Sequence, residues 1–244
     1  MYGWRARLGR INPSPETVGD EEWRRQCPDG VTVVSTRMFI ERVDAPGLTH
    51  MVTQVERAAR ELATARVGVI LMAGTAGAFN GGPGFDRELV KRIEDASGTR
   101  ATTTMTAVLE ALRALRARKL AVATSYIEPV DAALRDVLIA EGFDVLGIRG
   151  MGILKSIDMG DVQPKRTYEF AGEVFRAEPD ADAYFISCGN LRGLEAAARL
   201  EQELGKPVIT SNQAGLWQAL QMCGVAPSEV TGGGQLFRVE AAQC

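Results

Sequence analysis

Short apolar runs alternate with amphipathic segments along the whole chain. Apolar side chains recur at helical spacing, which predicts helices over 51–63, 86–93, 106–115, 129–140, 169–177 and 194–204. Apolar runs rich in β-branched residues predict buried strands at 31–35, 67–72, 120–124, 143–148, 183–188 and 208–210, with a short one near 8–12. Strands that alternate with helices in this way predict an α/β fold whose parallel sheets are covered by helices on both faces.

A weak internal repeat divides this pattern into two halves. Residues 97–104 and 204–211 each contain a glycine that ends a helix, a short strand, hydroxyl-bearing residues and the start of the next helix. A strand ending in small residues precedes each repeat. The residues after that strand are Gly74-Thr75 in the first half and Cys188-Gly189 in the second.

The repeat predicts two similar, flavodoxin-like parallel-sheet lobes related by pseudo-twofold symmetry. We assign residues 1–113 and 212–244 to the first lobe and 114–211 to the second. In open parallel sheets, ligands bind beyond the carboxyl ends of the strands. We therefore expect Gly74 and Cys188 on opposite walls of one cleft between the lobes, where free backbone N–H groups at the turns are ready donors to an anion.

The composition is that of an ordinary globular protein. Of the 244 residues, 45% are apolar and 24% are charged, and the formal net charge is −3. Nothing in this balance predicts nucleic acid or an anionic membrane as a partner. Residues 1–5 lack the apolar core of a signal peptide, and no stretch is long and apolar enough to span a bilayer, so we expect a cytoplasmic location. The sequence leaves the oligomeric state open.

The numbers and spacing of histidines and cysteines limit the catalytic and metal-binding sites that the chain can form. The chain has one histidine, His50, and four cysteines that form no CxxC pair. This pattern argues against structural zinc, and a reducing compartment argues against disulfides. A mechanism that pairs histidine with serine or cysteine would have to use His50, for which we expect a structural or solvated role near the start of a helix. The expected chemistry therefore uses other groups, with no metal and no cofactor.

The turns Ala73-Gly74-Thr75 and Ser187-Cys188-Gly189 resemble the two active-site motifs of the aspartate/glutamate racemase superfamily. Its racemases and maleate cis-trans isomerases carry a cysteine in each motif, whereas arylmalonate decarboxylases keep only the second and have glycine in the first. Gly74 and Cys188 match the decarboxylase pattern. Three further segments look like the decarboxylases, namely 104–109, 122–127 and 207–217, while 9–14 and 35–38 look more like the isomerases.

The resemblance implies a reaction and a role for each site residue. In a decarboxylase, the hydroxyl and N–H of Thr75, the Tyr126 hydroxyl and the Gly189 N–H would stabilise the enediolate formed when CO2 leaves. Cys188, as a neutral thiol, would protonate this intermediate from one face, because Gly74 offers no second acid or base. The remaining residues expected to form the substrate pocket are Pro13, Ser14, Ile40, Val43, Ala76 and Met159.

Each of these residues also has a simpler interpretation. A single cysteine at the end of an apolar strand is most often a small buried hydrophobe. In a purely structural interpretation, Thr75 would cap a helix, and Tyr126 would line the pocket with its hydroxyl already hydrogen-bonded. Only the resemblance favours Cys188 as a catalytic residue.

Three residues depart from the family pattern. Ala76 stands where a serine donates into the oxyanion site of the decarboxylases and isomerases. Glu16 aligns with an asparagine that holds a carboxylate in the isomerases, and Glu16 and Asp158 would both repel a dianion unless they are neutralised or point away.

We therefore keep three hypotheses, each with a small carboxylic acid as the partner. The first is a decarboxylase of a 2-aryl- or 2-alkylmalonate. The second is a maleate isomerase or an aspartate, glutamate or hydantoin racemase-like enzyme that works with one cysteine. The third is a binding protein without turnover.

Overall fold

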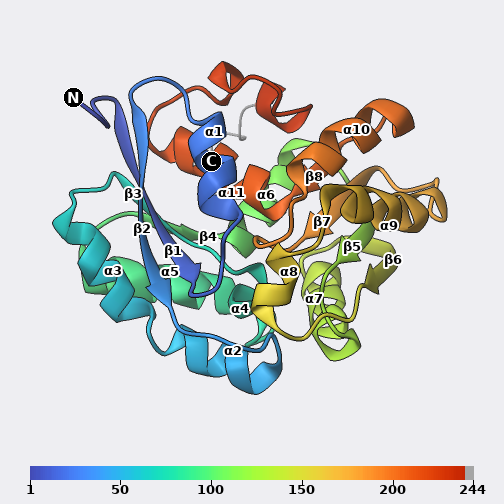
Figure 1. Ribbon diagram of the computed structural model, residues 1–244, viewed down its shortest axis with the longest axis horizontal. Helices are drawn as coiled ribbons and strands as arrows, with labels where there is room; N and C mark the ends of the chain where they lie inside the picture. The colour runs from blue at the N-terminus through green and yellow to red at the C-terminus, as the bar shows by residue number, and fades with distance from the viewer. Residues whose placement is uncertain (240–244) are drawn as a thin grey trace.

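Two parallel sheets form the framework of the computed structural model, which describes residues 1–239 (Figure 1). Each sheet has four strands, in the orders β2-β1-β3-β4 and β6-β5-β7-β8. The first sheet contains β1 (Ala6–Pro13), β2 (Val31–Met38), β3 (Val69–Met72) and β4 (Ala101–Thr103). The second contains β5 (Lys119–Thr124), β6 (Asp144–Gly150), β7 (Ala183–Ser187) and β8 (Val208–Thr210). The predicted fold class is confirmed, since each sheet repeats the same order of strands.

The helices follow the strands in the predicted alternation. They are α1 (Gly19–Gln26), α2 (Ala45–Val52), α3 (Val55–Thr64), α4 (Thr75–Phe79), α5 (Phe85–Ser97), α6 (Thr104–Ala114), α7 (Glu128–Ala140), α8 (Ser156–Gly160), α9 (Pro164–Arg176), α10 (Leu194–Leu204) and α11 (Ser211–Met222), with short 3-10 turns at Pro227–Glu229 and Leu236–Arg238. Among residues 1–239, no helix is long and apolar enough to cross a membrane.

The single helix predicted over 51–63 is wrong, because two helices occupy this region. The first, α2, begins well before the apolar pattern, where the Asp44 side chain accepts a hydrogen bond from the backbone N–H of Gly47 at 3.0 Å. It ends at Thr53, and α3 starts at Val55. Because the buried residues of both helices continue the same spacing, the apolar pattern does not reveal the break.

The internal repeat is visible in the backbone. Gly98 and Gly205 end α5 and α10 in the left-handed conformation, with φ of 65° and 67°. Thr103 and Thr210 then cap α6 and α11, each accepting a hydrogen bond from the backbone N–H three residues later. These two helices pack against each other at the centre of the molecule (Figure 1).

The assignment of residues to lobes stays a prediction. The helix α11 follows β8 of the second sheet but packs on β3 and α1 of the first half, as well as on α6. Residues 240–244, the end of the segment assigned to the first lobe, lie outside the described residues.

The strand register brings the two predicted site turns to the same edge of their sheets. In the first sheet, Ile11 of β1 pairs with Met72 of β3, so the chain leaves β3 beside the end of β1. In the second, Thr124 of β5 pairs with Ser187 of β7, so the turns after these strands also start together. Carboxyl ends of parallel strands are where ligands bind in such sheets.

Candidate active site

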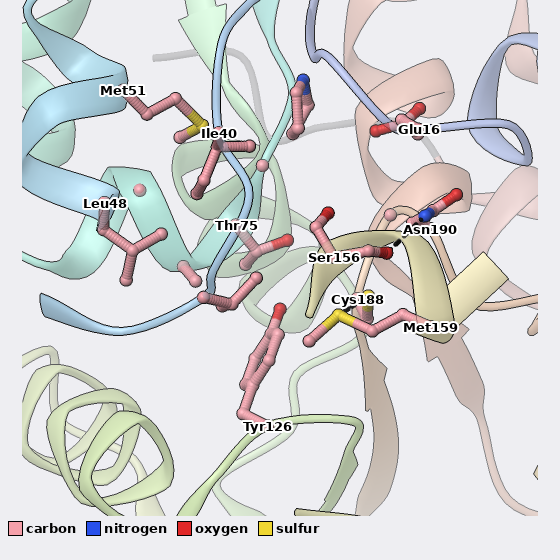
Figure 2. A pocket seen from close by; sticks show the side chains of 16 residues that line it. Glu16, Ile40, Leu48, Met51, Thr75, Tyr126, Ser156, Met159, Cys188 and Asn190 are labelled. Atoms are coloured by element: carbon pink, nitrogen blue, oxygen red, sulfur yellow. Dashed lines mark hydrogen bonds between the residues drawn. The ribbon is translucent and has the colours of Figure 1, made fainter. Parts of the chain in front are cut away.

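A pocket lies where the ends of β1, β3, β5 and β7 meet (Figure 2). All predicted site residues except Ser14 line it: Pro13, Ile40, Val43, Gly74, Thr75, Ala76, Tyr126, Met159, Cys188 and Gly189. The cavity has a volume of about 30 Å³, which is room for one or two water molecules. Side chains around it must therefore move when a larger substrate enters.

Gly74 and Thr75 form the wall contributed by the first sheet. Gly74 has φ of +95°, and a Cβ added there would lie 3.2 Å from Cγ of Pro13, so both backbone conformation and space favour glycine. Thr75 begins α4 and is buried, and its hydroxyl donates a hydrogen bond to Ser211 Oγ at 2.8 Å. This wall presents a hydroxyl and no acid or base at position 74.

Cys188 forms the facing part of the pocket, directly after β7. Its backbone N–H donates to Ser211 Oγ at 3.2 Å, and its Sγ lies 3.7 Å from Sδ of Met159. Burial raises the pKa of the Cys188 thiol to about 11. The neutral thiol therefore dominates at pH 7. This form suits a proton donor, whereas a nucleophilic cysteine would need the thiolate.

Ser211 joins these two walls and was missed by the sequence analysis. Its hydroxyl oxygen accepts from both the Thr75 hydroxyl and the Cys188 N–H. It is the first residue of α11, which Thr210 caps, so helix formation places it between the two sheets. The signal was present in the repeat at 204–211, which ends on this hydroxyl.

Tyr126 supplies a third hydroxyl, at the turn after β5. Its ring packs edge-on against Phe79, with centroids 6.2 Å apart, and its hydroxyl lies 3.3 Å from Ser187 Oγ. Burial raises the pKa of Tyr126 well above its ordinary value, so the group stays a neutral donor. Figure 2 shows this hydroxyl pointing toward the space between Thr75 and Met159.

The opposite side of the pocket is apolar. Buried side chains line it: Ile40, Val43, Leu48 and Met51; the apolar side chain of Met159 lies beside Cys188. The sequence analysis missed Leu48 and Met51, which α2 contributes and the misplaced helix start concealed. Ala76 presents only a methyl group, so the hydroxyl that the family has at this position is absent.

Ser14 holds the apolar side in place instead of lining the pocket. Its hydroxyl donates to the backbone oxygen of Ile40 at 3.3 Å and accepts from the backbone N–H of Ile40 at 3.1 Å. Ser14 does not line the pocket, and these two hydrogen bonds position Ile40, which does; contact of Ser14 with a substrate stays a prediction.

A buried charged cluster adjoins the pocket. Arg10, in the middle of β1, is only 1% exposed, and its Nη1 lies 2.7 Å from Glu16 Oε1 and 3.3 Å from Asp20 Oδ1. Its Nη2 donates to Asn212 Oδ1 at 2.9 Å. Of these residues, Glu16 lines the pocket itself. The signal for Arg10 was a charged residue inside an apolar strand, which the sequence analysis did not use.

The other residues singled out by the sequence lie outside the pocket. Asp158 and His50 are exposed, so Asp158 does not repel a ligand there. Residues 1–239 contain no group of three or more histidine, cysteine, aspartate or glutamate side chains arranged to hold a metal ion. Asn190, which also lines the pocket, ties its walls together by donating to the backbone oxygen of Ser156 at 2.8 Å and accepting from the Thr17 N–H at 2.8 Å.

Comparison with known proteins identifies the family. The model of the arylmalonate decarboxylase family matches residues 22–237. Arylmalonate decarboxylase from Bordetella bronchiseptica is 32% identical over 230 residues, covering 94% of this chain and 95% of the relative.

Solved structures agree with this likeness. A liganded double mutant of arylmalonate decarboxylase is 31% identical, with a TM-score of 0.90 over 95% of this chain and 98% of that one. A maleate isomerase mutant from Pseudomonas putida S16, solved with maleate, is 25% identical, with a TM-score of 0.92 over 98% and 99% of the two chains. With a matching family model, a shared fold and a pocket formed by the family's two motifs, this chain belongs to the arylmalonate decarboxylase family of enzymes, alongside decarboxylases and isomerases.

Proposed function

We propose that the protein is a cytoplasmic, cofactor-independent decarboxylase of a 2-aryl- or 2-alkylmalonate. The observation that carries this proposal is the pairing of Gly74 with a buried, neutral Cys188 in one pocket. One proton donor with no partner across the pocket suits a reaction that adds a single proton to a carbanion. The 32% identity to a decarboxylase over most of the chain supports it.

The first step breaks the bond between the α-carbon and the leaving carboxylate. This carboxylate lies among the apolar side chains of Ile40, Val43 and Met159, where a charge is poorly solvated and neutral CO2 is favoured. The electron pair of the broken bond passes into the retained carboxylate, giving an enediolate. The Tyr126 hydroxyl and the N–H of Gly189 donate hydrogen bonds to its oxygens, and the Thr75 hydroxyl joins them by turning away from Ser211 Oγ when the substrate binds. Each such donor contributes about 10²–10³ in rate.

The second step places a proton on the α-carbon. The Cys188 thiol donates it from one face, which gives one enantiomer when the α-carbon carries two different side groups. The thiolate left behind takes a proton from solvent before the next turnover, since burial raises the pKa of this thiol to about 11. The N–H that bonds Ser211 keeps the Cys188 turn in place during this exchange.

The alternative function is that of an isomerase or racemase with one cysteine. The likeness to a maleate isomerase, at a TM-score of 0.92, supports this alternative. Cys188 would then have to carry out both halves of the reaction, because Gly74 has no side chain. A binding protein for small acids, without turnover, is the remaining hypothesis, and the missing hydroxyl at Ala76 supports it.

Proton NMR in D2O with phenylmalonate, methylphenylmalonate and maleate separates these functions. A decarboxylase gives a monoacid with one deuterium at the α-carbon, and Cys188→Ala abolishes its formation. Cys223→Ala is the matched control, because this cysteine lies outside the pocket and should keep full activity. Fumarate formed from maleate would instead favour the isomerase. Binding without turnover, unchanged in Cys188→Ser, would favour the binding protein.

A further inference from the structure

Glu16 lies at the end of the pocket that also holds Asn190, away from Leu48 and Met51 (Figure 2). It is 3% exposed. Its backbone is fixed by two hydrogen bonds: its N–H donates to the Pro13 oxygen at 3.1 Å, and its own oxygen accepts from Arg37 Nη1 at 2.7 Å. The side chain therefore occupies a defined place in the pocket wall.

The free oxygen of this carboxyl group is close to the proposed oxyanion site. Glu16 Oε2 lies 3.3 Å from the point that a Cβ on Gly189 would occupy. Within the described part of the chain, Oε2 has no hydrogen-bond partner, although it is buried. An unpaired buried polar atom is costly, and in a pocket it marks a place where a ligand completes the hydrogen bond.

The charges around Glu16 determine whether its carboxyl group is protonated or ionised. Arg10, from β1, faces both Glu16 and Asp20 of α1. Asp20 also accepts from Asn12 and Ser35. Burial works against ionisation of Asp20, but Arg10 and these hydrogen bonds outweigh it and lower the pKa of Asp20, so Asp20 carries the charge that balances Arg10.

Among the described residues, the Glu16 carboxyl group has Arg10, at 2.7 Å, as its ion-pair partner, but no hydrogen bond like those that Asn12 and Ser35 give Asp20. Burial raises the pKa of Glu16, and the charge of Asp20 adds to this, while Arg10 and Arg37 of β2 act in the opposite direction. The Cys188 thiol, which also lines the pocket, is itself neutral. A protonated carboxyl group in such a site is a hydrogen-bond donor, and a neutral buried acid is a known way of stabilising an oxyanion.

We propose that protonated Glu16 donates a hydrogen bond from Oε2 to the carboxylate of the bound acid, beside the Gly189 N–H. It adds a donor to a site that lacks the family's hydroxyl at Ala76. The inference rests on the proposed function in one respect, namely that the ligand is a carboxylic acid. It turns the apparent repulsion between Glu16 and an anionic substrate into recognition by a protonated carboxyl group, with one proton taken up on binding at pH values where Glu16 is ionised in the empty site.

Calorimetric binding of phenylacetate tests the proton uptake. Titrations at several pH values, each in two buffers of different ionisation enthalpy, give the number of protons taken up. We expect uptake to rise toward one proton as the pH exceeds the pKa of Glu16 in the empty site. Glu16→Gln keeps a neutral donor, so it should bind within about tenfold of wild type with no uptake, whereas Glu16→Ala should bind at least tenfold more weakly at every pH.

A matched control is Glu22→Gln, which removes another buried carboxyl group with a raised pKa, outside this pocket. This variant should keep the proton uptake. Binding of phenylacetate without uptake at a pH where the infrared band shows Glu16 ionised in the empty site, or with equal affinity in wild type and Glu16→Ala, would overturn the inference.

Infrared spectroscopy of the empty protein separates this inference from the proposed function. The carbonyl band of a neutral carboxyl group, present in wild type and absent in Glu16→Gln, should persist above the ordinary glutamate pKa of about 4.5. A Glu16 band that titrates at or below that value would overturn the inference even if arylmalonates are decarboxylated. If arylmalonates are not turned over but the band persists and a carboxylate probe binds with proton uptake, only the proposed reaction fails.

Discussion

Glu22 of α1 is a buried carboxyl group whose ionisation should control the stability of the protein. Its oxygens accept hydrogen bonds from Asn212 Nδ2 at 2.7 Å and from the Leu194 N–H at 3.4 Å. Burial nevertheless dominates and raises the pKa of Glu22 from 4.5 to about 7. Replacement of Glu22 by glutamine removes this titration while retaining a neutral side chain of similar shape.

The expected magnitude follows from the two pKa values. Below pH 4.5, the carboxyl group is protonated in both folded and unfolded chains, so it favours neither. Between pH 4.5 and about 7, only the folded chain keeps the proton, so the free energy of unfolding falls by about 1.4 kcal/mol per pH unit. Over this window the loss is about 3 kcal/mol, and above it the difference stays constant.

Urea denaturation of wild type and Glu22→Gln, at pH values from 5 to 8, measures this loss. The buried Trp23 and Trp217 make fluorescence a suitable probe of unfolding. From pH 5 to 8 we expect the wild type to lose about 2.5 kcal/mol relative to the variant, because titrations common to both proteins cancel in the difference. Curves that stay parallel over the whole range would refute the reasoning, since they would mean that Glu22 is ionised in the folded state at pH 5.

Three further predictions concern the turns and caps of the site. Gly74→Ala should cost at least about 1–2 kcal/mol in urea denaturation, and more than Gly98→Ala, because both glycines have positive φ but only Gly74 is crowded; equal costs would contradict this. Ser211→Ala should lower stability by about 1–3 kcal/mol and reduce kcat, because it leaves two buried donors unpaired; an unchanged kcat would argue against its bridging role. Thr103→Ala and Thr210→Ala should each cost about 1 kcal/mol by loss of an N-cap, and thermal unfolding that spares either variant would disprove the equivalence of the two repeats.

The sheets and the site turns were predictable because each depends on a local signal. Apolar runs marked the strands, and the glycines that end α5 and α10 marked the repeat. The strand ends at Gly74 and Cys188 then had to meet, since parallel sheets collect their carboxyl ends at one edge. Most of the pocket lining therefore followed from the sequence and the family resemblance together.

The charged interior was not predictable in the same way. The helix α1 buries Asp20 and Glu22 beside Trp23, although its sequence is largely polar and the apolar pattern predicted no helix there. Its position depends on Arg10, whose guanidinium lies 5.1 Å from the Trp23 ring and joins residues far apart in the chain. Contacts between charged residues that lie far apart in the chain form only in the folded protein, so the pattern of apolar and polar residues does not predict them.

The burial of Cys188 has a consequence for how the protein withstands chemical damage. With a thiol pKa of about 11, about one molecule in ten thousand carries the thiolate at pH 7. Peroxides and alkylating reagents attack the thiolate, so both should modify Cys188 slowly unless the pH is raised. In the proposed function Cys188 acts only as an acid, so burial keeps it in the form least open to oxidation, and activity in aerated solution should not depend on added reductant.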